Sequence, residues 1–390
     1  MKGASWHYLD FAATSAIRPP RVAEAVHRFL VEVGSTPGRG GHRLALEAGR
    51  LALGCRQAVT RVLGLGSDPS RVAFCQNATQ ALNTALAGVL KSGDAVVVTA
   101  FDHNAVLRPV HRLASERGVE VRMVEGDAGG NLDLDGARML LDGARLLVVN
   151  GASNVLGTSL PVGDLSAMAH EAGALVLVDA AQWGGHFAES LADLGADLVA
   201  FTGHKALLGP QGIGGLWVRG GLQVDPLFAG GTGGDSRRRA MPDSLPDRLE
   251  AGSANSPGMA GLLAGISFLE EEGVAALRGR EMELKALLRD GLSSLPGVRV
   301  LSPPGEKGVG IVTVVSDRID PPTLAMRLDR EWGVMVRHGL NCAPEVHRIL
   351  GTEATGAVRL SLGWASTADD VDRALEGMSA LTSQPSVPVS

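Results

Sequence analysis

Short, continuous runs of hydrophobic residues alternate with segments of helical spacing through the first two thirds of the chain. The runs are rich in Val and Leu and occupy residues 72–75, 96–99, 146–149, 175–178 and 198–201. Between them, residues 79–90 and 105–117 place hydrophobic side chains three and four positions apart. Continuous hydrophobic runs are typical of strands covered on both faces, and helices between such strands indicate crossover connections. The pattern predicts an α/β fold with a mainly parallel sheet.

The last third of the chain differs in composition and in the pattern of hydrophobic positions. Residues 229–255 are rich in Gly, Pro, Ser and Arg, which indicates a long irregular excursion, and loops of that length are usually functional. A helical stretch follows at 258–295, broken near Gly273. It is followed by strand-like runs at 298–301 and 311–315, a helix near 322–332 and a terminal helix from Thr367. These elements predict a second, smaller α+β domain.

This change in composition and pattern determines the predicted domain boundaries. We place the large domain at residues 15–262 and the small domain at residues 263–390. Residues 1–14 are expected to pack near the small domain, and residues 382–390 have the composition of a frayed tail.

Composition and charge exclude several classes of protein. Of the 390 residues, 45 % are hydrophobic and 20 % are charged, which is ample for a buried core and excludes intrinsic disorder. The net charge of −6 leaves no excess of positive charge for a nucleic acid or an anionic membrane surface. No hydrophobic run reaches the roughly 18 residues of a membrane span, and the first residues lack the hydrophobic stretch of a signal peptide. We expect no nucleic-acid partner, no membrane partner and a cytoplasmic location.

The three cysteines are widely separated and have no metal-ligand spacing. Such an odd set predicts neither a disulfide framework nor a metal site, and it fits a reducing compartment. Cys55 and Cys75 lie in or beside hydrophobic segments, where a free thiol packs as a small hydrophobic group. Cys342 instead lies in a loop-like stretch, 336–344, with Arg337 nearby, which suits a mobile thiolate nucleophile.

Lysine is rare in this chain, because only five of the 36 basic residues are lysines. One of them, Lys205, comes directly after the hydrophobic run 198–201. It is either a surface lysine on a loop or an amine whose pKa is lowered by burial, which can form a Schiff base with an aldehyde cofactor or a carbonyl substrate. Asp179 ends another such run, and Gln182 follows it by three residues. A carboxylate at this edge of an α/β sheet could keep a pyridine nitrogen protonated, which would make pyridoxal phosphate an effective electron sink.

Two further segments join predicted strands to predicted helices. Residues 76–79 can offer backbone N–H groups and a helix dipole to a phosphate, which is compatible with an ordinary helix cap by Asn77 or Thr79. His103 follows the run 96–99 and could lie against the ring of a cofactor, although a loop histidine is more often solvated.

Arg359 is a single charge in the hydrophobic run 357–361. An unpaired guanidinium in such a place is costly. It therefore predicts a site for a carboxylate, which arginine can hold with two hydrogen bonds.

Together these residues resemble the class V aminotransferase family of fold-type I pyridoxal phosphate enzymes, and within it the cysteine desulfurases of the sulfur-mobilisation (Suf-like) branch. The resemblance covers nearly the whole chain and is carried by nine segments in the order of the family. They are YLDFAAT (8–14), GRGGH (38–42), NAT (77–79), DH (102–103), SNVLGT (153–158), DAAQ (179–182), TGHK (202–205), EAGSAN (250–255) and GLNCAP (339–344). The last segment, followed by Gly351 and Thr352, is most similar to a less characterised desulfurase-like subgroup.

The resemblance implies a large domain with a mainly parallel sheet of the seven-stranded type, and it implies roles for individual residues. Lys205 would carry the cofactor as a Schiff base, Asp179 would pair with the pyridine nitrogen, and His103 would stack on the ring. The implied catalytic residues are Lys205, Cys342 and His103. The implied cofactor-binding residues are Ala78, Thr79, His103, Asn154, Asp179, Gln182, Thr202, His204, Lys205 and, from a second subunit, Ser253. The implied substrate-binding residues are Ala13, His42, Asn154 and Arg359.

The resemblance also implies a reaction, in which a homodimer converts L-cysteine to L-alanine and Cys342 takes the sulfur as a persulfide, with a possible sulfur-acceptor protein. This chain departs from the usual family pattern at three places. Asn341 stands where His is usual, Ser253 stands where Thr is usual, and residues 365–367 are Ala-Ser-Thr where Tyr-Asn-Thr is usual. The substrate preference and the sulfur acceptor therefore stay open.

Two alternatives to a desulfurase stay open as well. One is a transaminase, an epimerase or a selenocysteine lyase on the same fold, for which Cys342 would be dispensable. The other is a non-catalytic protein that binds the cofactor and serves as a scaffold for sulfur-transfer partners. Formation of alanine from cysteine separates the desulfurase from these alternatives.

Overall fold

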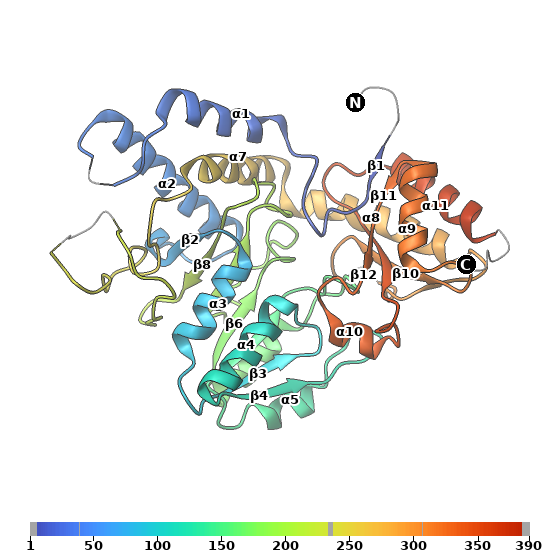
Figure 1. Cartoon of the computed structure of the whole chain (residues 1–390), viewed down its shortest axis with the longest axis horizontal. Coiled ribbons are helices and arrows are strands. Elements are labelled where there is room, and N and C mark those ends of the chain that lie inside the picture. The colour runs from blue at the N-terminus through green and yellow to red at the C-terminus, as the bar shows by residue number, and fades with distance from the viewer. Residues whose placement is uncertain (1–5, 39, 233–236, 306, 384–390) are drawn as a thin grey trace.

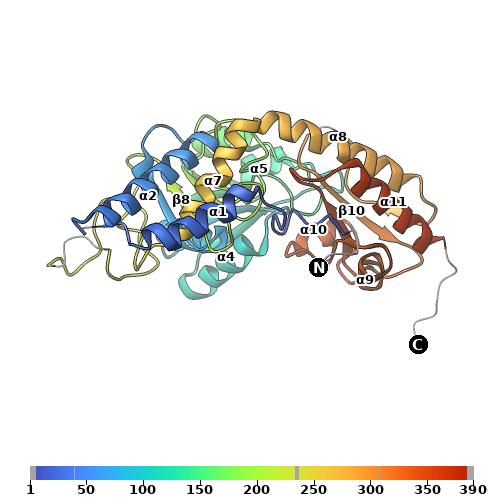
Figure 2. The ribbon, with the colours of Figure 1, turned by 90° about the horizontal axis from the view of Figure 1, so that it is seen from above.

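The computed structural model describes residues 6–38, 40–232, 237–305 and 307–383 of the chain. Residues 1–5 of the predicted N-terminal segment and residues 384–390 of the predicted tail lie outside the described residues. Figures 1 and 2 show two parts side by side, which we call the large and the small domain.

The large domain is built on a seven-stranded sheet. In spatial order its strands are β2 (Val72–Cys75), β8 (Gly214–Val218), β7 (Leu198–Thr202), β6 (Leu175–Asp179), β5 (Leu146–Asn150), β3 (Ala95–Thr99) and β4 (Glu120–Val124). Neighbouring strands run parallel except at β8, which is antiparallel to both β2 and β7. The predicted mainly parallel sheet is confirmed.

Helices cover both faces of this sheet. One face carries α3 (Ala78–Val89) and α4 (Asn104–Arg117), and the other carries α2 (Arg43–Val62), α5 (Leu134–Leu140), α6 (Val162–Glu171) and α7 (Ser256–Glu272). In β5, Leu146 and Val148 belong to the core under α3 and α4, whereas Leu147 and Val149 belong to the opposite core. Because both faces are buried, the first four positions of the strand, 146–149, are all hydrophobic.

The small domain has an antiparallel sheet in the order β12 (Arg337–Gly339), β13 (Ala357–Ser361), β10 (Ile311–Ser316) and β9 (Val298–Val300). Its own hydrophobic core lies between this sheet and the helices α8 (Val274–Ser293), α9 (Pro321–Trp332) and α11 (Ala368–Thr382). α8 runs from the large domain along the small one (Figure 2), and it is separated from α7 by Gly273, whose φ is 83°. The predicted break in the helical stretch is therefore confirmed.

The N-terminal segment joins the small domain from the other end of the chain. β1 (His7–Tyr8) pairs in parallel with β11 (Val334–Met335). Past it, the chain crosses to α1 (Pro20–Arg28) and the π-helix η1 (Phe29–Val33), which lie beside α2 and α7 (Figure 1). The short 3₁₀ helix η2 (Pro69–Arg71) leads into β2. The boundary predicted between residues 262 and 263 falls inside α7 and stays a prediction.

Two stretches without regular structure were predicted, and they differ in outcome. Among the described residues from 219 to 255 there is no helix or strand, as the composition predicted. The stretch 336–344, predicted as a loop, is mostly ordered, since β12 occupies its first part and α10 (Pro344–Ile349) begins at its end. Only residues 340–343 form the loop that carries Cys342.

Candidate active site

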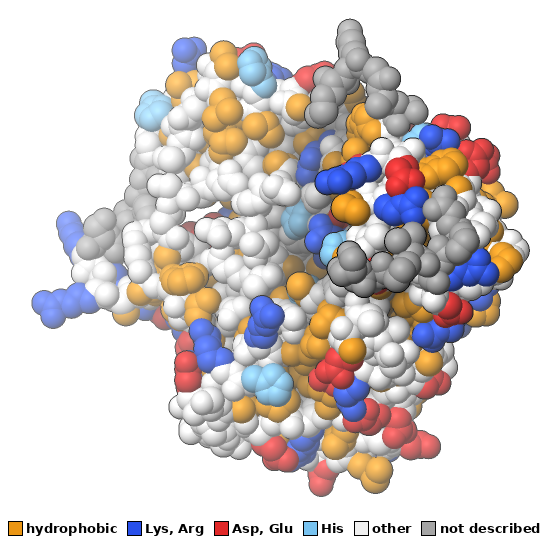
Figure 3. Space-filling view, turned by 45° about the vertical axis from the view of Figure 1, so that its right-hand side comes forward, with side chains coloured by type: hydrophobic (Ala, Val, Ile, Leu, Met, Phe, Trp, Pro, Cys, Tyr) orange, Lys and Arg blue, Asp and Glu red, His pale blue; other side chains and the backbone are white. Residues whose placement is uncertain are grey.

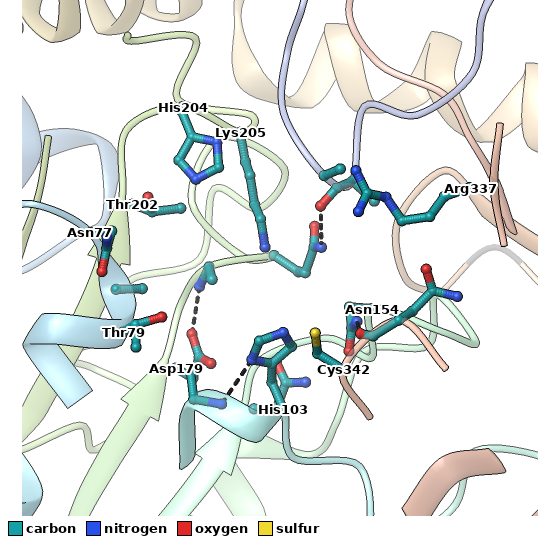
Figure 4. Close-up of a pocket in the computed structure, with 18 of the residues that line it drawn as sticks. Asn77, Thr79, His103, Asn154, Asp179, Thr202, His204, Lys205, Arg337 and Cys342 are labelled. Atoms are coloured by element: carbon teal, nitrogen blue, oxygen red, sulfur yellow. Dashed lines mark hydrogen bonds between the residues drawn. The ribbon is translucent and has the colours of Figure 1, made fainter. Parts of the chain in front are cut away.

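A cavity of about 290 Å³ lies between the two domains, at the carboxyl ends of the parallel strands (Figure 4). In the space-filling view, Lys, Arg and His side chains lie at the edge of the hollow between the domains (Figure 3). The walls include Ala13, Ala78, Thr79, His103, Asn154, Asp179, Gln182, Thr202, His204, Lys205, Cys342 and Arg359. Ligands of open α/β sheets bind at this edge, because loops and helix starts converge there. The structure therefore brings twelve of the fourteen sequence-predicted site residues to one cavity.

Lys205 and Asp179 form the buried centre of the cavity. Lys205 comes just after β7, and burial of its ammonium lowers the pKa to about 8, while Asp179 acts in the opposite direction. Asp179 ends β6 and is 3 % exposed. Its Oδ1 accepts a hydrogen bond from the Ala181 N–H at 2.9 Å, and burial raises its pKa. Both side chains point into the cavity (Figure 4), so an amine and a carboxyl face the same ligand space.

At one end of the cavity, α3 begins and two buried polar atoms lack a partner. Asn77 caps the helix, because its Oδ1 accepts a hydrogen bond from the Gln80 N–H at 3.0 Å. Thr79 lies in the first helical turn and lines the cavity. Thr202 Oγ1 and His204 Nδ1 are buried there and make no hydrogen bond. A helix N-terminus beside polar atoms in need of a partner is a site that suits an anion such as a phosphate.

His103 is a neutral imidazole at the start of α4. Burial lowers its pKa to about 4, and the nearby Lys205 acts in the same direction. Its Nδ1 accepts a hydrogen bond from the Ala105 N–H at 2.9 Å, so the neutral ring carries its proton on Nε2. The ring therefore faces the cavity without a charge of its own.

Arg359, predicted as a site for a carboxylate ligand, already contacts a carboxylate of the protein itself. Arg359 is 3 % exposed, and its Nη2 donates to Asp10 Oδ1 at 3.0 Å while its Nη1 donates to the Asn154 carbonyl at 3.0 Å. Arg337, which pairs with Arg359 across β12 and β13, donates to the same Asp10 carboxylate at 2.9 Å. Asp10 was not found from the sequence, because it lies 349 residues away from Arg359 in the chain.

Two guanidinium groups nevertheless share one carboxylate. The Nε of Arg359 is buried without a hydrogen-bond partner, and Arg337 also lines the cavity. The wall formed by the small domain therefore keeps an excess of positive charge and a free donor for a carboxylate ligand.

Cys342 is exposed and lies in the short loop between β12 and α10. Asn341 and Cys342 have left-handed backbones, with φ of 49° and 58°. The Asn104 N–H donates to the Cys342 carbonyl at 2.7 Å, and Asn154 Nδ2 donates to the Asn341 carbonyl at 2.7 Å. Two hydrogen bonds thus join the backbone of the loop to the large domain, and the predicted mobility of the Cys342 thiolate stays a prediction.

The other two cysteines are less exposed than Cys342. Cys55 is buried in α2 and Cys75 is half-buried at the end of β2, and burial raises the pKa of each thiol to about 12. Neither lines the cavity around Lys205. Their predicted role as packing residues is consistent with this burial.

Two predicted site residues lie outside the cavity of their own chain. Ser253 lines a separate cavity of about 440 Å³, which shares only Asn77 with the first. His42 caps α2, where its Nδ1 accepts a hydrogen bond from the Ala45 N–H at 3.3 Å. Sequence reasoning in turn missed Asn150 as a wall of the main cavity; its place at the end of β5, the strand next to β6, is the signal that could have found it.

Comparison with known proteins identifies the family to which this chain belongs. The aminotransferase class-V model matches residues 7–374. A probable cysteine desulfurase of Methanothermobacter thermautotrophicus is 34 % identical over 371 residues, which is 93 % of this chain and 92 % of the relative. A probable cysteine desulfurase of Pseudomonas aeruginosa is 36 % identical over 376 residues, 94 % of this chain and 91 % of the relative.

Solved structures agree with the sequence relatives. The apo cysteine desulfurase of Thermococcus onnurineus NA1 has a TM-score of 0.90 at 32 % identity and covers 97 % of this chain and 95 % of its own. The cysteine desulfurase CsdA of Escherichia coli has a TM-score of 0.85 at 27 % identity, with 96 % and 94 % covered. The chain belongs to the aminotransferase class-V family, and within that family it groups with the cysteine desulfurases.

Proposed function

We propose that the protein is a pyridoxal-phosphate-dependent cysteine desulfurase, which converts L-cysteine to L-alanine and takes the sulfur onto Cys342. The observation that carries the proposal is that one cavity holds both a buried amine, Lys205, and an exposed thiol, Cys342. A transaminase of the same fold needs the amine and has no use for the thiol. The desulfurase relatives support the same conclusion.

The residues at the base of the cavity fit pyridoxal phosphate. Ala78, Thr79, Thr202 and His204 would hold the phosphate, and the unpartnered Thr202 Oγ1 and His204 Nδ1 would gain the partners that they lack. Asp179 would pair with the pyridine nitrogen, and Asn154 and Gln182 would lie near the phenolic oxygen. When bound, the cofactor supplies an aldehyde that reacts with amines and a ring that withdraws electrons from the amino acid.

Lys205 then has two uses. It can hold the cofactor covalently, and once free it can take the proton from the substrate Cα. Because burial lowers its pKa to about 8, a substantial fraction of the amine is neutral near neutral pH. General base catalysis of this kind contributes ~10²–10⁴ in rate.

The small-domain wall would bind the substrate carboxylate. Arg359 offers its unpartnered Nε, and Asp10 keeps the guanidinium in place. Ala13 lines the same cavity and leaves room for a small amino acid. The chemistry of this wall fits a three-carbon amino acid with a free carboxylate.

Cys342 would receive the sulfur. Its thiolate attacks the substrate sulfur, the Cβ–S bond breaks and an S–S bond to Cys342 forms. The three-carbon fragment gains a proton and leaves as alanine. The net change is one cysteine and one Cys342 thiol converted to one alanine and one Cys342 persulfide, so atoms and electrons balance. The persulfide must be unloaded by a thiol, on an acceptor protein or on a small molecule.

We further propose a two-fold homodimer, in which Ser253 and His42 serve the neighbour's cavity. Large hydrophobic side chains are exposed on η1, on α2 and on the irregular excursion. These segments lie on the same side of the molecule (Figure 1). The exposed side chains are Leu30, Val31, Leu46, Leu53 and Phe228, which are 48–70 % exposed. A patch of this kind on one side of a molecule marks an interface.

The place of action is also a proposal. The three cysteines are free, and Cys342 must be reduced in order to act, which favours the cytoplasm. None of the helices in the described part of the chain is long and hydrophobic enough to cross a bilayer.

The function is tested by supplying the purified protein and pyridoxal phosphate with a panel of amino acids, and by measuring alanine and sulfide together. We expect alanine from L-cysteine in the absence of any 2-oxo acid. A requirement for a 2-oxo acid as a second substrate would identify a transaminase instead, and no product from any amino acid would favour the non-catalytic scaffold.

A further inference from the structure

A second cavity opens on the outer side of Cys342. It has a volume of about 320 Å³ and lies along α4, and Asn83 of α3 also lines it. It shares Thr79, His103, Ala105 and Cys342 with the main cavity. Cys342 therefore stands between two spaces, one that contains Lys205 and one that does not.

The second cavity is basic. Arg108 and Arg112 lie one turn apart on α4, and both are exposed and line the cavity. Arg108 makes no salt bridge or hydrogen bond with any residue that the structure describes. Arg112 has one salt bridge, to Glu116 at 3.8 Å, in which the two side chains are 49 % and 57 % exposed. Such an exposed pair is weak.

No acidic side chain offsets these two charges inside the cavity. Among the described residues, neither Asp nor Glu contributes to its walls. Two guanidinium groups without a strong partner attract carboxylates, which they can bind with paired hydrogen bonds. The volume lies at the small end of the range for small-molecule sites, roughly 300–1,000 Å³.

We propose that this cavity, which we call the α4 cavity, binds the sulfur acceptor, and that the acceptor is a small thiol that carries carboxylates. The proposal rests on the proposed function, because it needs the Cys342 persulfide. Arg108 and Arg112 hold the carboxylates, and the thiolate of the acceptor attacks the outer sulfur of the persulfide. The S–S bond to Cys342 breaks, its electron pair leaves with the Cys342 thiolate, and the acceptor departs as a persulfide.

The two cavities thereby separate loading from unloading. Cysteine enters on the Lys205 side and leaves its sulfur on Cys342, and the acceptor takes that sulfur from the α4 side. The acceptor does not have to enter the space in which the amino acid and the cofactor bind.

The experiment uses the holoenzyme in two stages. In the first stage, one equivalent of L-cysteine loads Cys342, and alanine is measured. In the second stage, after removal of small molecules, one of three thiols is added and the loss of the persulfide is followed by mass spectrometry. The thiols are 2-mercaptoethanol, 3-mercaptopropionate and mercaptosuccinate, which carry no, one and two carboxylates.

The double variant Arg108→Gln and Arg112→Gln is compared with the wild type and with Arg330→Gln, an exposed arginine on α9. The measured quantity is the unloading rate with mercaptosuccinate divided by that with 2-mercaptoethanol. This ratio cancels any change in Cys342 or His103 that the variants cause. We expect it to fall about three- to tenfold in the double variant, as for the loss of exposed charge contacts. It should stay unchanged in Arg330→Gln.

An equal ratio in the wild type and the double variant would overturn the proposal, and so would a preference for the uncharged thiol. Unloading only by an acceptor protein, with none of the three thiols active, would overturn it as well. Failure of the first stage, with no alanine formed, would instead refute the proposed function.

Discussion

Lys205 and Cys342 divide the chemistry of the cavity between an amine and a thiol, and single substitutions can separate the two. Cys342→Ser is expected to bind the cofactor and L-cysteine, because Lys205, Asp179 and Arg359 are untouched. Alanine formation should collapse, since a serine hydroxyl is hardly ionised near neutral pH and cannot store sulfur. The measurement is alanine formed per minute under reductant.

The other two thiols provide the matched controls. Cys55→Ser and Cys75→Ser place a hydroxyl where burial raises the thiol pKa to about 12, so they should lose some stability and keep activity. Wild-type rates of alanine formation in Cys342→Ser would leave only the fold and the cofactor proposal standing.

The covalent role of Lys205 has its own test. Lys205→Ala removes the buried amine that faces Asp179 in the cavity. Borohydride should fix pyridoxal phosphate covalently to the wild type and should fix none to the variant, as measured by protein mass. Lys91→Ala, which removes an exposed lysine paired with Asp225, is the control and should behave as the wild type does. Covalent attachment in Lys205→Ala would assign the Schiff base to another residue.

The expected pH dependence of activity follows from the lowered pKa values of Lys205 and His103. Because the pKa of Lys205 is lowered to about 8, the neutral amine that can act as a base accumulates as the pH rises through 8. The pKa of His103 is lowered to about 4, so this ring is neutral throughout the range from 5.5 upward. Alanine formation at saturating cysteine should therefore rise through about pH 8 and then level off. A single rise near pH 6.5 would point to a histidine with an ordinary pKa.

At the residue scale, the sequence indicated the site residues that follow strands, and it missed the carboxylate that neutralises Arg359. Lys205, Asp179 and His103 each come just after or at the end of a hydrophobic run, so their common edge could be foreseen. The salt bridge between Asp10 and Arg359 could not, because it joins the N-terminal segment to a strand that comes 349 residues later in the chain. The roles of His42 and Ser253 in the cavity of a second subunit remain predictions.

At the element scale, the loop of Cys342 depends on backbone conformation. Asn341 has a φ of 49°, in the region that Gly and Asn adopt readily and β-branched residues avoid. Asn341→Gly should keep alanine formation within about twofold of the wild type. Asn341→Val should lower it by roughly tenfold or more, because a left-handed valine costs ~1–2 kcal/mol and shifts the neighbouring thiol.

Measurements of stability on the same two variants test whether a loss of activity comes from unfolding. Asn341→Gly should leave the free energy of unfolding nearly unchanged, and Asn341→Val should lower it by the same ~1–2 kcal/mol, a loss that leaves the protein folded at the assay temperature. Equal activity of Asn341→Gly and Asn341→Val would show that the left-handed backbone does not position Cys342.

The strands that the pattern predicted in the large sheet are buried at nearly every position. Fully buried strands such as β3 and β5 are hydrophobic at every position except the last. β4 is an edge strand of sequence EVRMV with an exposed glutamate, and β8 starts with two glycines, so neither gives that signal. β12 has the sequence RHG, and only its pairing with β13 makes it a strand.

At the scale of the whole molecule, the proposed homodimer depends on the exposed hydrophobic patch. The wild type should sediment as a dimer at micromolar concentration. Val31→Asp places a charge at a position that is 70 % exposed in one chain, and it should shift the protein toward monomer and lower its activity. Met139→Asp, at an equally exposed methionine on α5, is the control and should remain dimeric.

An active wild-type monomer at that concentration would contradict the proposed dimer. It would also remove the reason to assign Ser253 and His42 to a neighbour, since neither reaches the cavity of its own chain.

The pairing of β1 with β11 sets the order in which the molecule can be completed during synthesis. His7 leaves the ribosome among the first residues, and its partner Val334 comes 327 residues later. At ~5–20 residues per second, this strand pair must wait roughly 15–65 s for its second half. The salt bridge between Asp10 and Arg359 waits longer still. The nascent chain can therefore assemble the larger sheet while its N-terminal segment is unpaired, and the wall proposed to bind the substrate carboxylate is among the last parts to form.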